Sequence, residues 1–186
     1  MLSAFKEKGE TMKHFLNRIA NEDNINNVTY VAKLDPMASG IVPLIPKTEF
    51  KNMPQFLHLN KIYHVDVIFG YQTDSDDILG ILQNINLDFE PSKFTDYIKS
   101  INDNHTFQQE YHYFSSKRLQ HRRKGKDEPG KYKHSVTIHN VKILSNSTKD
   151  FDTWKLNIIN DILKVDPSCK FRQDDIIKQW RNITQS

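Results

Sequence analysis

The sequence of 186 residues is poor in several features that mark particular classes of protein. Its single cysteine, Cys169, excludes an internal disulfide and fits a reducing compartment. No apolar run approaches the ~18 residues that a membrane-spanning helix needs, and charged residues interrupt the N-terminus, which argues against a secretory signal. The histidines show no zinc-site spacing such as H-E-x-x-H, and Asp74, Asp76 and Asp77 lack the spacing of a calcium-binding EF-hand. We therefore expect an intracellular protein with no membrane segment and no metal site.

The net charge of +3 is too small to indicate a nucleic-acid partner by itself, but the positive charges are unevenly distributed. Residues 117–126 contain no acidic side chain. The cations of this basic run are Lys117, Arg118, Arg122, Arg123, Lys124 and Lys126. Such a cluster provides several phosphate contacts when it lies against a nucleic acid, and it is also typical of a solvated loop. The residues alone leave both interpretations open.

The most informative segment is LDPMASG, residues 34–40, which precedes the apolar run IVPLIP. Proline fixes φ and glycine permits positive φ, so Pro36 and Gly40 favour a defined loop around Asp35. A carboxylate held on a rigid loop beside a buried strand is the usual presentation of a catalytic acid. An ordinary Asp-Pro turn is the simpler interpretation, and the wider sequence pattern decides between the two.

Two long motifs make up that wider pattern. Residues 32–44 read AKLDPMASGIVPL, and residues 61–65 and 69–77 read KIYHV and FGYQTDSDD. The first resembles the G-x-L-D-P-x-A-[TS]-G-[VI]-L-P-[IL] signature of the TruB family of RNA pseudouridine synthases. The second, with Gly80 after it, resembles that family's K-x-Y-x-[AV] block and the G-x-x-T-D-T-x-D-x-x-G stretch that follows it. The order and the spacing of the two motifs also agree with the family.

Weaker similarities extend the resemblance over nearly the whole chain. KEKGET, residues 6–11, is similar to the family's K-P-x-G-x-T segment without its proline. Residues 108–117 are similar to Q-x-P-P-x-Y-S-A-x-K, and residues 168–173 are a shortened version of C-S-x-G-x-Y-[IV]-R-[ST] that contains Arg172. Lys33 departs from the family pattern, because a small residue usually stands beside the catalytic loop. From the length of the sequence we expect no additional RNA-binding module of the kind that many relatives carry.

Hydrophobic spacing and turn residues predict helices interleaved irregularly with strands, which favours an α+β fold. Thr11 is expected to cap the first helix, and residues 21–27 to form a loop. Helices are predicted at residues 48–59, 91–101 and 174–183, and strands at 28–31, 62–69, 136–144 and 154–165. The resemblance implies a single pseudouridine synthase domain over residues 1–186, with a basic RNA-contacting insertion near 117–133. Its mixed, largely antiparallel sheet would be flanked by helices around a central RNA-binding cleft.

The resemblance also implies roles for individual residues. Asp35 would be the essential catalytic carboxylate, acting as a nucleophile or a base without any cofactor. Tyr63 would stack on the flipped uracil, Lys61 would help to bind the substrate, and Arg172 would pair with Asp35 and keep it ionised. The cations Lys117, Arg118, Arg122, Arg123 and Lys124 would contact the RNA.

The expected substrate is RNA, and the resemblance implies the T-loop uridine at position 55 in the tRNA T-arm, modified by a monomeric enzyme. The alternative is a catalytically inactive relative that binds or folds RNA. A third possibility is a DNA-binding or scaffold protein that uses only the basic run. It predicts an affinity that does not depend on the loop structure of the RNA.

Overall fold

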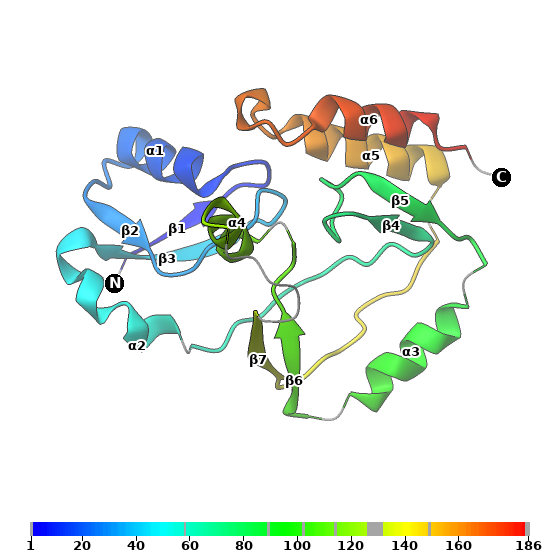
Figure 1. Cartoon of the computed structure of the whole chain (residues 1–186), viewed down its shortest axis with the longest axis horizontal. Helices are drawn as coiled ribbons and strands as arrows, with labels where there is room; N and C mark the ends of the chain where they lie inside the picture. The colour runs from blue at the N-terminus through cyan, green and yellow to red at the C-terminus, as the bar shows by residue number, and fades with distance from the viewer. Residues whose placement is uncertain are drawn as a thin grey trace. The chain divides into compact units, whose positions relative to one another are not determined.

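The computed structural model describes residues 2–57, 59–88, 90–101, 103–113, 115–125, 132–148 and 150–184. Internal contacts divide the chain into two compact units, which are described separately (Figure 1). Unit 1 comprises Met1–Ile68, Asp77–Ile81 and Asp150–Ser186, and unit 2 comprises Phe69–Asp76 and Leu82–Lys149. That the whole chain acts as a single domain stays a prediction.

The N-terminal part of unit 1 is built on a three-stranded antiparallel sheet. β3 (Gly40–Pro46) lies between β1 (Leu2–Lys6) and β2 (Val28–Tyr30). The segment of residues 31–39, here named the Asp35 loop, connects β2 to the neighbouring strand β3. Both ends of the Asp35 loop are therefore fixed to one sheet.

The helix α1 (Met12–Glu22) packs on this sheet and supplies much of its core. As predicted, Thr11 caps the helix, and its hydroxyl accepts a hydrogen bond of 3.2 Å from the backbone N–H of His14. The predicted loop at residues 21–27 begins later than expected, because α1 continues to Glu22. The buried core residues of this part are Phe15, Ile19, Val28, Val42 and Leu44.

The C-terminal part of unit 1 is a pair of helices that lie side by side in Figure 1, α5 (Phe151–Leu163) and α6 (Gln173–Asn182). A short 3₁₀ turn, η2 (Pro167–Cys169), lies between them. The predicted terminal helix is confirmed as α6, but the strand predicted at 154–165 is wrong. That segment is helical because Ile158, Ile159 and Ile162 form one buried helix face, and Asp150 caps the start of the helix.

Two further predictions for unit 1 need correction. The helix predicted at 48–59 is divided into η1 (Lys47–Asn52) and α2 (Pro54–Leu57), because a proline starts a helix better than it continues one. The strand predicted at 62–69 is not formed, and residues 61–68 are irregular in the structure. β-rich composition stabilises a strand only where a partner strand pairs with it, and this segment pairs with none among the described residues.

The described residues of unit 2 form two antiparallel strand pairs. β4 (Tyr71–Thr73) pairs with β5 (Leu82–Ile85), and β6 (His105–Glu110) pairs with β7 (Lys133–Ile138). β7 begins and ends earlier than the strand predicted at 136–144. The helices of this part are α3 (Pro91–Ser100), as predicted, and α4 (Ser116–Arg123) within the basic run. The strand pairs of both units are antiparallel wherever the chain is described, which confirms the expected α+β class.

Candidate active site

The Asp35 loop is held by a buried lysine at the end of β1. The Lys6 side chain is wholly inaccessible to solvent. Its ammonium donates hydrogen bonds to the carbonyl oxygens of Ala38 at 2.7 Å, Glu7 at 3.1 Å, Asp35 at 3.2 Å and Pro36 at 3.4 Å. Three of these acceptors belong to the Asp35 loop. One cation therefore fixes the backbone at the candidate catalytic residue and just after it.

Burial and neighbouring charges shift the pKa of Lys6 in opposite directions. Burial lowers the pKa of its ammonium below the usual range, and the negative charges of Glu10, Asp35 and Glu7 oppose this effect. Glu10 is itself bound to Arg18, with Nε 2.6 Å from Oε1. The Arg18 guanidinium also donates to the carbonyl oxygen of Phe5 at 2.8 Å. Residues 5–10, which contact the Asp35 loop through Lys6 and Gly9, are thus held at both ends by Arg18.

Gly9 makes the second attachment of the Asp35 loop. Its N–H donates a hydrogen bond of 2.8 Å to the carbonyl oxygen of Pro36. Gly9 has φ of +95°, and a Cβ atom there would lie only 2.6 Å from Cβ of Lys164, at the end of α5. Glycine is therefore required at this position for both its backbone conformation and its lack of a side chain.

The Asp35 carboxylate faces solvent. Its backbone carbonyl closes a turn by accepting a hydrogen bond of 3.0 Å from the N–H of Ala38. The side chain of Asp35 is exposed and makes no hydrogen bond or ion pair with any residue that the structure describes. A fixed backbone and an accessible carboxylate are what a nucleophile or a general base requires.

The other predicted substrate-binding residues lie elsewhere in unit 1. Tyr63 is 75% exposed in the irregular segment, not on a sheet as predicted. Lys61 donates hydrogen bonds to the carbonyl oxygens of Leu57 at 3.3 Å and Leu59 at 3.0 Å. It thus provides a donor for carbonyl groups at the C-terminal end of α2 and just after it. Neither contacts Asp35 within the described residues, and their roles in binding a substrate stay predictions.

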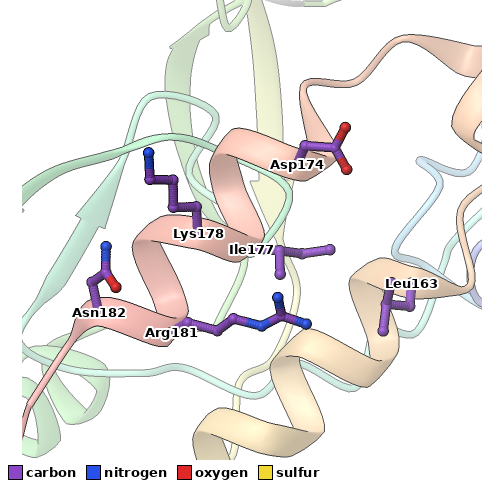
Figure 2. A pocket seen from close by; sticks show the side chains of 6 residues that line it. All are labelled: Leu163, Asp174, Ile177, Lys178, Arg181 and Asn182. Atoms are coloured by element: carbon purple, nitrogen blue, oxygen red, sulfur yellow. The ribbon is translucent and has the colours of Figure 1, made fainter.

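Arg172 begins α6 in a left-handed conformation, with φ of +61°. It lines an open pocket of about 440 Å³ with Lys170, Asp174 and Asp175, and Asp35 is not among the described residues that line this pocket. The ion pair between Arg172 and Asp35 stays a prediction. A second, adjoining pocket of about 310 Å³ is shown in Figure 2, where Arg181 extends from α6 toward Leu163 of α5.

The basic run in unit 2 contains two kinds of cation. Arg118 is 7% exposed, and its guanidinium lies 3.4 Å from both Oε1 of Glu110 and the carbonyl oxygen of Tyr111. Its contacts fasten α4 to the end of β6. Arg123 and Lys124 are exposed. The side chain of Lys117 lies outside the described residues. So do residues 126–131 of the predicted insertion, which include Lys126.

The described residues also bear on membrane spanning and metal binding. No helix among them is both long enough and apolar enough to cross a membrane. No group of three His, Cys, Asp or Glu side chains in that part of the chain is arranged to hold a metal ion. The absence of a cofactor stays a prediction.

Comparison with known proteins identifies the family. Residues 18–159 match the family model for the N-terminal domain of the TruB family of pseudouridylate synthases, and this chain belongs to that family. It is 32% identical over 105 residues to tRNA pseudouridine synthase B of Mycoplasmoides gallisepticum, a match covering 56% of the chain and 49% of the relative. It is 31% identical over 93 residues to the Blochmanniella pennsylvanica protein of the same name, covering 50% of the chain and 34% of the relative. The chain thus spans about half or less of the curated relatives it matches.

The family match separates the predicted residues into two groups. Asp35, Lys61, Tyr63 and the basic run lie within residues 18–159, whereas Arg172 lies beyond them. The sequence analysis missed Lys6, Gly9 and Glu10 as residues that position the Asp35 loop. The only signal for them was the KEKGET segment, whose similarity to the family motif did not reveal which backbone groups it would hold.

Proposed function

We propose that this protein converts uridine to pseudouridine in RNA, most specifically at the T-loop uridine, position 55, of tRNA. The observation that carries the proposal is the Asp35 carboxylate, exposed on a loop that the buried Lys6 fixes through three carbonyl oxygens. Asp35 lies within the family match, and the relatives are named tRNA pseudouridine synthase B. We further propose that the protein is intracellular and monomeric.

In the proposed reaction, the N1–C1′ bond of uridine breaks and a C5–C1′ bond forms. Asp35 either attacks C1′ as the nucleophile or removes a proton from the sugar to give a glycal. The detached uracil turns and C5 bonds to C1′, which breaks the Asp35–C1′ bond in the first route and returns the sugar proton in the second. C5 then loses its proton, and N1 gains one. Lys6 does not touch the substrate; it positions the backbone that carries the carboxylate. Tyr63 is the proposed stacking partner of the uracil, for which its 75% exposed side chain is available.

Binding of the RNA backbone is assigned to the three cations at the end of α4 and just after it. Arg122, Arg123 and Lys124 have no acidic partner within the described residues, so their charges are available to phosphates. The guanidinium of Arg118 already contacts Glu110 and the carbonyl oxygen of Tyr111. We therefore assign to Arg118 a structural role in this region and not a role in RNA binding. This narrows the contact surface predicted from the sequence.

The direct test measures tritium release from an unmodified tRNA transcript labelled at C5 of uridine. Wild-type protein is expected to release tritium, and Asp35→Asn is expected to lose at least about 10³-fold in rate while binding the transcript normally. Asp88→Asn, at another exposed aspartate, is the matched control and keeps wild-type activity. Mapping the product to position 55 tests the T-loop assignment. Release by Asp35→Asn at the wild-type rate would refute the catalytic role.

The alternative is a family member that binds or folds RNA without isomerising it. One observation favours it: Tyr63 lies in an irregular segment and not on a sheet. It predicts tight binding of the transcript with no tritium release from any uridine. The DNA-binding alternative is tested by competition, because a folded T-arm displaces bound RNA better than duplex DNA only if the protein recognises RNA structure.

A further inference from the structure

Arg122, in α4, is held against an aromatic ring of the segment before the helix. The guanidinium carbon of Arg122 lies 3.7 Å from the centre of the Tyr113 ring. The same guanidinium donates a hydrogen bond of 3.2 Å to the carbonyl oxygen of Tyr113. The side chain is thus fixed by one stacking contact and one hydrogen bond, both from a single residue.

Tyr113 is in turn supported by the buried arginine of the same helix. The Arg118 guanidinium lies 5.4 Å from the centre of the Tyr113 ring and reaches Glu110 and the carbonyl oxygen of Tyr111. Arg118 satisfies its charge with Glu110. Arg122 has no carboxylate partner among the described residues and uses one of its donors on Tyr113. Most donors of a planar five-donor group remain for a ligand.

We propose that Tyr113 is a positioning residue that holds Arg122 ready to bind a phosphate of the RNA backbone. This inference rests on the proposed function and adds a residue that the sequence analysis left without a role. A free arginine loses rotamer freedom when it binds, whereas a stacked and hydrogen-bonded guanidinium has already lost it. Stacking leaves the edge of the guanidinium open, which is the edge that pairs with phosphate oxygens.

The neighbouring side chains indicate an anion of nucleic acid as the ligand. Arg123 and Lys124 follow directly and are exposed, and Gly125 lies just after the helix with φ of +65°. Residues 117–126 contain no acid that would neutralise these charges. A row of adjacent phosphates offers each cation its own partner, which a single carboxylate does not.

The test is a double-mutant cycle read by binding of an unmodified tRNA transcript over a range of salt concentrations. Tyr113→Leu is expected to weaken binding about two- to fivefold, the range for one lost cation–π contact. Arg122→Gln is expected to lower the salt slope by about 0.7–0.9, the effect of one phosphate. In the Arg122→Gln background, Tyr113→Leu is expected to have no further effect. Tyr113→Phe, which keeps the ring, is expected to bind like the wild type.

Arg123→Gln is the matched control, because that cation does not touch Tyr113. Its effect is expected to add to that of Tyr113→Leu. Additive effects of Tyr113→Leu and Arg122→Gln would overturn the inference, as would an unchanged salt slope in Arg122→Gln. If Tyr113→Leu fails to fold, Arg122→Lys replaces it. This variant keeps the charge but loses the planar stack, and wild-type affinity in it would also overturn the inference.

Tritium release at saturating transcript separates this inference from the proposed function. A wild-type protein that binds with the expected coupling but releases no tritium refutes the isomerase assignment and leaves the Tyr113–Arg122 inference standing. Tritium release with additive mutant effects refutes only the inference. If the wild type does not bind the transcript, both are refuted.

Discussion

Nζ of Lys6 lies 2.7 Å from the carbonyl oxygen of Ala38, 32 residues later in the chain. The same ammonium reaches the carbonyl oxygens of Asp35 and Pro36. A carbonyl in a loop normally turns to solvent, whereas these three converge on one buried cation. The conformation around Asp35 is therefore set by a residue outside the loop, and this arrangement leads to the first prediction.

Replacement of Lys6 by methionine is expected to destabilise the protein by about 1–3 kcal/mol, because several carbonyl oxygens lose their donor in a buried site. Relief from burying a charge offsets part of the cost. Lys8→Met is the control: Lys8 forms a surface ion pair with Asp161 at 2.8 Å, and its loss is expected to cost at most about 1 kcal/mol. Urea unfolding measures both. Equal destabilisation of the two variants would contradict the structural role of Lys6.

A second prediction concerns Gly9. Alanine here adopts an unfavourable positive φ and brings Cβ within 2.8 Å of the backbone of Lys164. We expect Gly9→Ala to cost about 3 kcal/mol from both effects. Gly125 also has positive φ, but a Cβ atom added there would meet no other atom within 4 Å, so Gly125→Ala is expected to cost about 1 kcal/mol. Thermal and urea unfolding of Gly9→Ala and Gly125→Ala measure both costs, and the difference between them separates the effect of crowding from that of backbone strain.

The pH dependence of stability is predicted to depend on Glu10. Burial acts to raise the pKa of Glu10, but the hydrogen bond from Arg18, the N–H of Glu7 and nearby positive charges together bring it below its ordinary value of 4.5. The ionised form is thus favoured by folding. Its contribution is fully present above pH 4.5 and is lost as the pH falls through the lower folded-state pKa.

Glu10→Gln is therefore expected to reduce stability by about 1–2 kcal/mol at pH 7, through loss of charge-assisted hydrogen bonds. The difference from the wild type should shrink as the pH is lowered below 4.5, because the wild type then also loses this charge. Unfolding curves at pH 7 and at acid pH give the difference in free energy of unfolding between Glu10→Gln and the wild type at each pH. A difference that stays constant over this range would contradict a depressed pKa for Glu10.

The division of the basic run gives a fourth prediction. Arg118→Gln is expected to lower the free energy of unfolding by about 1–3 kcal/mol, because it removes buried contacts with Glu110 and Tyr111. Arg123→Gln, at an exposed position, should change stability by less than about 0.5 kcal/mol but weaken RNA binding. The opposite result, with Arg123 essential for stability and Arg118 only for binding, would reverse the assignment.

Sequence reasoning succeeded where the determinants are local. Thr11 caps α1 through an N–H three residues away, and Pro91 starts α3, so both signals lie within one turn of the helix they begin. It failed for residues 154–165, which were predicted to form a strand. There the buried helix face packs on α6, and the rings of Trp154 and Trp180 meet at 5.6 Å, a contact that composition does not reveal.

The candidate site was predictable in part for the same reason. The sequence could propose Asp35 because the residues of the matching family motif are close neighbours in the chain, at residues 32–44. It did not identify Lys6 as a support, because lysine is seldom fully buried and its acceptors lie up to 32 residues away. Arg172 was assigned from a shortened motif; it stands at the start of α6, and its predicted role stays a prediction.

The inaccessibility of Lys6 also gives the protein an internal chemical reporter. An amine-reactive reagent acylates exposed lysines such as Lys8, whereas Lys6 is out of its reach while the Asp35 loop is closed over the ammonium. Acylation of Lys6, followed peptide by peptide in a mass spectrometer, therefore times the opening of that loop. Footprinting of this kind would follow the conformation of the loop around Asp35 without a substrate and without a substitution in the sequence.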